Sequence, residues 1–132
     1  MGPHHFHLER IGAEYPDRDG ALRHDKTAQL AISRGIAESV AGPGVTVNAV
    51  LPGPTRSEGA IEFLEKIARE RGMDLKEAET EVIRTLRPTS LLKRMATPEE
   101  VANLAVYLCG EPASATTGSA LRVDGGVVRT IT

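Results

Sequence analysis

The feature that most constrains the fold is a pair of short apolar runs that lie far apart in the chain. The first, residues 45–51, is β-branched and almost continuously apolar, and Pro52 ends it. The second, residues 119–123, runs into the turn 124–126. Helical patterns fill the sequence between the two runs, so they cannot pair as a tight hairpin. They predict parallel strands joined by a right-handed crossover, the unit of a doubly wound α/β sheet.

Four helices are predicted from apolar residues that recur at helical spacing. They span residues 26–41, 58–71, 75–86 and 98–108. Asp25, Asp74 and Thr97 stand at N-cap positions, and a glutamate three residues after each of the last two completes a capping box. The middle two helices carry dense charge opposite their apolar faces, which is typical of a surface flap, here residues 57–87. Their charge runs, at residues 65–66, 70–71 and 76–81, are interpreted as solvated helix faces.

The first 23 residues differ from the rest of the chain. Residues 1–23 show no sustained hydrophobic period, so this segment is predicted to be an irregular arm that precedes one partial domain over residues 24–132. His4, His5 and His7 could ligate a metal ion, but no cysteine or acidic cluster nearby completes such a site. We therefore expect no metal site in this protein.

Charge and cysteine content exclude several classes of partner and compartment. The formal net charge is −2, which gives no reason to expect nucleic acid or an anionic membrane as a partner. The single cysteine, Cys109, excludes an intramolecular disulfide framework and fits a reducing compartment. No uninterrupted apolar run approaches the roughly 18 residues of a membrane span. These observations predict a cytoplasmic chain.

Several short motifs, in this order and spacing, resemble the C-terminal half of the short-chain dehydrogenase/reductase family, whose members use NAD(P). The motifs are Lys26-Thr27-Ala28, Val47-Asn48-Ala49-Val50-x-Pro52-Gly53, Thr97-Pro98-Glu99-Glu100-Val101-Ala102, and Thr117-Gly118 followed by Val123-Asp124-Gly125-Gly126. The resemblance covers roughly three-quarters of the chain, from Lys26 to Val127. It implies an α/β fold with a partial, Rossmann-like doubly wound sheet.

The resemblance also implies roles for individual residues. Lys26 stands where the family places a lysine that bonds the nicotinamide ribose and lowers the pKa of a catalytic tyrosine. Residues around Thr55 and the hydroxyl of Ser57, in the loop that Pro52 and Gly53 open, would meet the nicotinamide amide. The helices over residues 57–87 would form the mobile flap that sets substrate specificity. The implied cofactor is NAD(P), held by Lys26, Pro52, Gly53, Thr55 and Ser57.

Departures from the family pattern argue against catalysis by this chain alone. The tyrosine should lie four residues before the lysine, and that position holds Leu22, which has no proton to give. Tyr15 is the only nearby phenol, but residues 16–20 separate it from the helix. The earlier strand that carries the family's catalytic serine is missing, and no G-x-G-x-x-G phosphate loop occurs. Lys26 is then either a remnant of the Tyr-x-x-x-Lys pair or an ordinary solvated lysine.

Three readings of function remain open at the level of the sequence. The chain is a truncated relative of NAD(P)-dependent oxidoreductases that is inactive alone, an interaction module of the same origin, or a weak nucleotide binder. Family members assemble through the lysine-bearing helix and through the final helix and strand, and half a sheet leaves a strand edge and an apolar helix face uncovered. We therefore expect a homo-oligomer, a dimer or tetramer, that completes the partial sheet.

Other residues receive structural interpretations. Asn48, on an apolar strand, is expected to make structural hydrogen bonds, and Cys109 is expected to be a packed small apolar residue. The segment 124–126 is interpreted as a turn whose glycines permit unusual backbone angles. Leu91 and Leu92, with Met95, are either an exposed anchor for a partner or a segment lying beside the flap.

Overall fold

Strands and helices alternate along most of the chain. The computed structural model describes residues 6–10, 20–42 and 44–130, and only the backbone of residues 6–10 and 20–26. The elements are β1 (Phe6–Arg10), α1 (Gly20–Ser39), β2 (Thr46–Pro52), α2 (Glu58–Arg71), α3 (Leu75–Leu86), α4 (Pro98–Leu108), a 3-10 turn (Glu111–Ala113) and β3 (Ala120–Val123). The predicted helices and strands are present, several with the expected boundaries.

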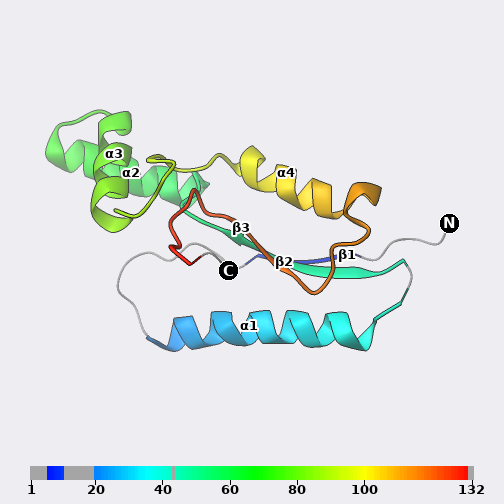
Figure 1. Cartoon of the computed structure of the whole chain (residues 1–132). Coiled ribbons are helices and arrows are strands. Elements are labelled where there is room, and N and C mark those ends of the chain that lie inside the picture. Colours follow the sequence, from blue (N-terminus) through cyan, green and yellow to red (C-terminus); the bar gives the residue numbers. More distant parts are fainter. Residues whose placement is uncertain (1–5, 11–19, 43, 131–132) are drawn as a thin grey trace.

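The three strands form one parallel sheet in the order β1-β2-β3. The predicted strands β2 and β3 pair in parallel, with Ala49 opposite Ala120. The sheet lies between two helices, with α1 along one face and α4 along the other (Figure 1). This arrangement confirms the predicted α/β fold class, a partial doubly wound sheet flanked by helices.

The structure differs from the sequence prediction in the N-terminal segment. Residues expected to be irregular include a strand, Phe6–Arg10, which adds to the sheet at the free edge of β2. Helix α1 begins at Gly20, so Asp25 lies inside the helix rather than at its N-cap. The five residues of β1 are too few to give a clear period, and pairing with β2 supplies the backbone partners that fix their conformation. Good helix formers before Asp25 extend α1 backwards.

Residues 47–50 of β2 are all buried, because successive side chains point to opposite faces of the sheet and both faces are covered there. Val50 packs with Leu108 and Ala113 in a small buried cluster under α4. Val47 and Ala49 are also buried and point to the other face, which α1 covers (Figure 1). The sheet is therefore held between two thin apolar layers.

Helices α2 and α3 pack against each other and build a core of their own. It consists of Ala60, Leu64, Ala78, Val82, Ile83 and Met95. Helix α2 ends at Gly72, whose φ of 63° is the left-handed conformation that favours glycine. The predicted capping box of α3 is present, with the Asp74 carboxylate accepting from the Glu77 backbone N–H at 2.7 Å. We call residues 57–96 the flap region, because Met95 closes its core.

Several large apolar side chains around the sheet remain exposed. Ile32 on α1 is 58% exposed and Val106 on α4 is 70% exposed. On α1, Ser33 and Ala37 are buried, while Ile32 on the helix and Val40 just after it face outward. The sheet region thus carries apolar surface that its own elements do not cover.

Candidate functional site

The loop that follows β2 is tied closely to the end of β3. The backbone N–H of Gly53 donates to the Val123 carbonyl at 2.9 Å. A Cβ at Gly53 would lie 2.5 Å from the Asp124 Cα, so no other residue fits without moving the backbone. This close approach brings the carboxyl ends of β2 and β3 together, which is where doubly wound sheets bind ligands.

Thr55 and Ser57 follow in the same loop and are its two hydroxyl-bearing residues. Thr55 bridges Ala96 in parallel fashion, with Arg56 N–H donating to the Ala96 carbonyl at 2.9 Å. The Thr55 hydroxyl donates to the Gly53 carbonyl at 2.9 Å. Ser57 is the N-cap residue of α2, yet its hydroxyl makes no capping hydrogen bond. The Ser57 hydroxyl is therefore not needed to hold the helix.

A hollow of about 450 Å³ lies beside this loop, between β2 and α4. We call it the loop hollow; it is lined by Val50, Pro52, Thr55, Ser57, Pro98, Val101, Ala102 and Ala105. Three of the five predicted cofactor-binding residues, Pro52, Thr55 and Ser57, line it, and Gly53 holds the loop in place. An apolar wall with two hydroxyl groups at one end suits a flat ring that carries an amide.

Lys26 is the remaining one of the five predicted cofactor-binding residues. It lies near the start of α1, whose first turns are at the carboxyl end of the sheet (Figure 1). Lys26 and Leu22 are in a part of α1 for which only the backbone is described, so their predicted roles stay predictions. Tyr15, His4 and His5 fall outside the described residues, and the side chain of His7 does so too.

An ion pair between a buried glutamate, Glu79, and a half-exposed arginine, Arg56, connects the flap region to the loop, and it is not among the sequence predictions. Glu79 on α3 is only 6% exposed. Its carboxylate accepts from the Arg56 guanidinium at 2.7 Å and from the Met95 backbone N–H at 2.8 Å. The interpretation of residues 76–81 as a solvated charge run is therefore wrong at Glu79. The signal was present, since Glu79 lies among Ala78, Val82 and Ile83 on the apolar stripe of its helix.

A second ion pair fastens the start of α4. Arg94 and Glu100 pair through two contacts, the shorter at 2.7 Å, and Glu100 also completes the capping box with Thr97. The hydrogen bond from Arg94, followed by the backbone N–H of Thr97, lowers the pKa of the Glu100 carboxyl to about 2. Glu100 therefore stays charged well below the usual titration range of a glutamate, and it ties Arg94 to the start of α4.

The segment between α3 and α4 crosses the glycine turn at the end of β3. The backbone N–H groups of Leu91 and Leu92 both donate to the Gly125 carbonyl at 2.9 Å. Gly125 and Gly126 have φ values of 64° and 76°, which confirms the expected turn with unusual backbone angles. Leu91 is 81% exposed, whereas Met95 is buried in the flap core. Met95 is therefore not part of an exposed anchor, and a partner-binding role for Leu91 and Leu92 stays a prediction.

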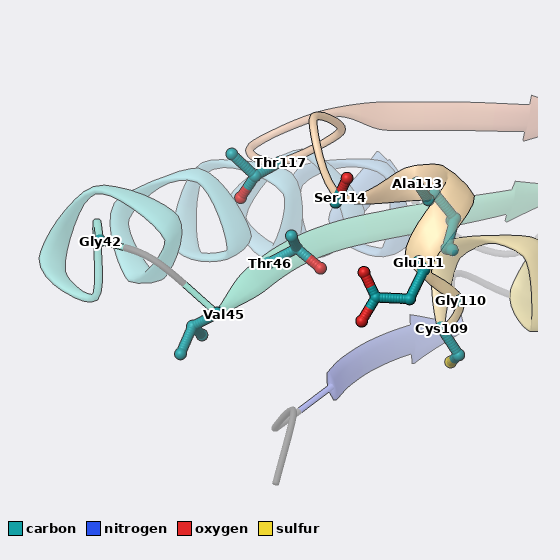
Figure 2. Close-up of a pocket in the computed structure, with 11 residues that line it drawn as sticks. Gly42, Val45, Thr46, Cys109, Gly110, Glu111, Ala113, Ser114 and Thr117 are labelled. Atoms are coloured by element: carbon teal, nitrogen blue, oxygen red, sulfur yellow. The ribbon is translucent and has the colours of Figure 1, made fainter. Parts of the chain in front are cut away.

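Another hollow, of about 310 Å³, lies at the opposite, amino end of β2. Figure 2 shows the Thr46 hydroxyl and the Glu111 carboxylate pointing toward the same space, with Ser114 and Thr117 nearby. None of the predicted site residues lines it. Cys109, which does, is exposed, so its expected packing as a small apolar residue is wrong: it lies just beyond the buried end of α4.

One further expectation is confirmed by the structure. Asn48 makes structural hydrogen bonds: its side-chain amide donates to the Thr116 carbonyl at 2.8 Å and accepts from the Ser119 N–H at 3.2 Å.

Among the described residues no group of three or more His, Cys, Asp or Glu side chains could hold a metal ion. No helix in that same part of the chain is long and apolar enough to cross a membrane.

Comparison with known proteins gives the family. A family model described as Enoyl-(Acyl carrier protein) reductase matches residues 11–128. The chain belongs to the short-chain dehydrogenase/reductase family. Its match to the uncharacterized oxidoreductase YvrD of Bacillus subtilis (strain 168) is 46% identical over 106 residues, which are 80% of this chain and 40% of YvrD. A second Bacillus subtilis oxidoreductase, YvaG, is 42% identical with the same coverage of both chains.

A solved structure extends the similarity to three dimensions. L-sorbose reductase from Gluconobacter frateurii, complexed with NADPH and L-sorbose, is 31% identical to this short-chain dehydrogenase/reductase chain with a TM-score of 0.78. The similarity covers 96% of this chain and 47% of the reductase. The chain spans about 40% of the length of YvrD and YvaG, so it corresponds to part of a short-chain dehydrogenase/reductase.

Proposed function

We propose that this chain supplies the nicotinamide-side loop and the substrate flap of an NAD(P)-dependent oxidoreductase, and that it transfers no hydride by itself. The observation that carries the proposal is the loop hollow at the carboxyl end of β2, which three of the predicted cofactor-binding residues line. The flap region is fastened directly to this loop by Glu79 and Arg56. A cofactor ring in the hollow would therefore lie beside the flap that selects the substrate.

The residues of the hollow fit the nicotinamide end of such a cofactor. Val50, Val101 and Ala105 offer an apolar wall for a ring, and the Thr55 and Ser57 hydroxyls offer hydrogen bonds to an amide. When bound, the cofactor would supply the hydride chemistry. The solved L-sorbose reductase that this chain resembles was crystallised with NADPH, which supports the choice of cofactor class.

Two features support inactivity of the chain alone. The position of the family's proton-donating tyrosine holds Leu22, whose hydrocarbon side chain can neither give nor accept a proton. The sequence also contains no G-x-G-x-x-G loop, whose backbone N–H groups would cradle a pyrophosphate. Binding through the nicotinamide end alone is expected to be weak, with a Kd on the order of 1 mM.

The test is a titration of the purified chain with NADH and NADPH, followed by cofactor fluorescence and by calorimetry. We expect weak saturable binding that Ser57→Ala weakens, because its hydroxyl is not engaged in capping α2. Ser114→Ala, at the opposite end of β2, is the matched control and should bind as the parent chain does. Oxidation of NADPH by the chain with any of a panel of ketones would contradict the proposed inactivity. Binding that is indifferent to Ser57→Ala would remove the loop hollow as the site.

A second candidate function, an interaction module that forms a dimer or tetramer, is favoured by the apolar surface of α1. Ile32 and Val40 are exposed large side chains on and just after this helix. Light scattering at micromolar concentration should give a mass above that of one chain, and Ile32→Glu should reduce it. Arg34→Glu, on the same helix but in an exposed ion pair, is the control. A monodisperse monomer would overturn this candidate.

A further inference from the structure

The hollow at the amino end of β2 belongs to no part of the proposed cofactor site. We call it the amino-end hollow; its volume is about 310 Å³, and the loop hollow lies near the other end of the same strand. It lies where the loop after α1 meets the turn after α4 (Figure 2). A hollow of this volume is at the lower end of the range for small-molecule sites.

Oxygen-bearing side chains line the amino-end hollow. Among the described residues they are Thr46, Glu111, Ser114 and Thr117, and no lysine or arginine lines the hollow with them. The Thr46 hydroxyl and the Glu111 carboxylate point toward the same space (Figure 2). The Thr117 hydroxyl oxygen accepts the Val47 backbone N–H at 3.1 Å, which holds this side chain beside β2. The charged side chain that lines the hollow is therefore an acid.

Two helices also direct their C-terminal ends toward this end of the sheet. Helix α1 ends just before Gly42 and α4 just before Cys109, and both ends lie near the start of β2 (Figure 1). The carbonyl groups of a last turn give a helix C-terminus a partial negative charge. Neither helix has a basic residue in its last turn to balance that charge. The Leu108 carbonyl also lacks the next helical hydrogen bond, because Pro112 has no N–H to donate.

Arg34, one turn before the end of α1, has to be counted against this negative charge. Its guanidinium lies against Gly118 and is paired with the Glu38 carboxylate at 2.8 Å. The pair carries no net charge, and Arg34 does not line the hollow. The Glu111 carboxylate and the two helix ends therefore leave the amino-end hollow with a potential that favours a cation.

We propose that the amino-end hollow binds the primary ammonium group of a small alkyl amine. A primary ammonium donates N–H groups only, and the Glu111 carboxylate and the Thr46 hydroxyl can accept them. Val45, Leu108 and Ala113 offer apolar surface for a short alkyl chain. A metal ion is a poorer match, because no cluster of His, Cys, Asp or Glu side chains in the described chain could hold one. The site is independent of the proposed cofactor function, since the two hollows share no residue.

The test is an NMR titration of the full chain with n-butylammonium chloride, read at the backbone amides of Thr46, Glu111 and Thr117. We expect saturable shifts of these amides with a Kd on the order of 1 mM. The neutral ligand 1-butanol, of equal chain length, should bind at least about fivefold more weakly, and butyrate should not bind. Raising the ionic strength from about 50 mM to about 500 mM should weaken the binding of the amine, because salt screens the charges.

Two substitutions locate the site. Glu111→Gln keeps the shape of the side chain but removes its charge, and it should weaken amine binding by about threefold to fivefold, the range for an exposed ion pair. Glu99→Gln is the matched control, because Glu99 is an exposed carboxylate at the opposite end of α4. Thr46→Val removes one acceptor and should weaken binding about twofold. Circular dichroism checks the fold of each variant, and the comparison of ligands on the parent chain decides the question without any variant.

Four outcomes would overturn the proposal. Equal binding of amine and alcohol, or no saturable shift at tens of millimolar amine, removes the ammonium site. Equal effects of Glu111→Gln and Glu99→Gln show a general charge effect in place of a site. Equal shifts of the same amides by KCl or MgCl2 show that any cation suffices, and overturn the amine as the ligand. Shifts that follow protein concentration rather than added amine identify a lysine of a second copy as the occupant, and overturn the small molecule.

Discussion

The flap region and the sheet region solve the problem of burying apolar side chains in different ways. The flap closes a core from two helices that are neighbours in sequence, and Leu64, Ala78 and Ile83 in it are almost completely buried. The sheet region has a smaller buried cluster around Val50 and leaves Ile32 and Val106 exposed. The flap region thus buries its apolar side chains within itself, whereas the described sheet region leaves several of its own exposed.

The largest expected effect comes from opening the flap core. Leu64→Ala should destabilise the flap region by about 3 kcal/mol, because it leaves a cavity where the side chain was 1% exposed. Hydrogen exchange followed by mass spectrometry should show lost protection in α2 and α3 and little change in β2. Ile61→Ala, an exposed site on the same helix, is the control. Equal loss of protection in β2 would show that the two regions unfold together.

The next effect concerns the joint between β2 and β3. Gly53→Ala forces a Cβ against the Asp124 backbone and should lower the free energy of unfolding by about 2 kcal/mol. Gly59→Ala, in α2, meets no atom within 4 Å and should be neutral or slightly stabilising through helix propensity. Urea unfolding followed by circular dichroism measures both. A neutral Gly53→Ala would mean that the sheet tolerates a shift of this joint.

A smaller effect on the free energy of unfolding is expected from the ion pair between Glu79 and Arg56, which connects the flap region to the loop after β2. Glu79→Gln keeps the shape of the side chain but removes the charge that the Arg56 guanidinium contacts. We expect a loss of about 1.5 kcal/mol in unfolding free energy, since the Met95 N–H keeps an oxygen acceptor. Glu62→Gln on the exposed surface of α2 should change almost nothing. If the two variants unfold at the same urea concentration, the ion pair between Glu79 and Arg56 does not stabilise the attachment of the flap region.

The smallest effect is a pH dependence at the start of α4. The pKa of Glu100 is lowered from 4.5 to about 2 in the folded chain, so its contribution to stability is complete above pH 4.5. It is lost as the pH falls from about 4.5 toward 2. An NMR titration of the Glu100 carboxyl should show the low midpoint, and Arg94→Gln should move that midpoint upward. A normal midpoint in the parent chain would contradict the pairing.

The elements predicted best from sequence are those with local signals. The capping boxes at Asp74 and Thr97 and the glycine at the end of α2 fix helix ends through hydrogen bonds within a few residues, so sequence alone locates them. The sequence also locates the loop from Pro52 to Ser57, because Pro52 ends the apolar strand that precedes it. The family's motif order predicts a cofactor site around Thr55; Thr55 lines the loop hollow, and its cofactor role stays a prediction.

The elements missed depend on contacts between distant parts of the chain. Strand β1 is defined by its pairing with β2, and five residues carry too little pattern to predict it. Glu79 lies on the apolar stripe of α3, which indicates burial, but its partners Arg56 and Met95 come from other segments and cannot be predicted from the sequence around it. Cys109 was expected to be packed, but its exposure depends on where α4 ends relative to the turn that follows. Tertiary context decided each of these cases.

The parallel pairing of the sheet sets an order of events when the chain is synthesised. Ala49 of β2 pairs with Ala120 of β3, so β2 leaves the ribosome long before its partner strand exists. The contacts between α2 and α3, by contrast, are all local and can form at once. The flap region is therefore expected to fold first, while the edge of β2 that will pair with β3 is still unpaired. During that interval the strand is the segment most exposed to aggregation and to capture by a chaperone.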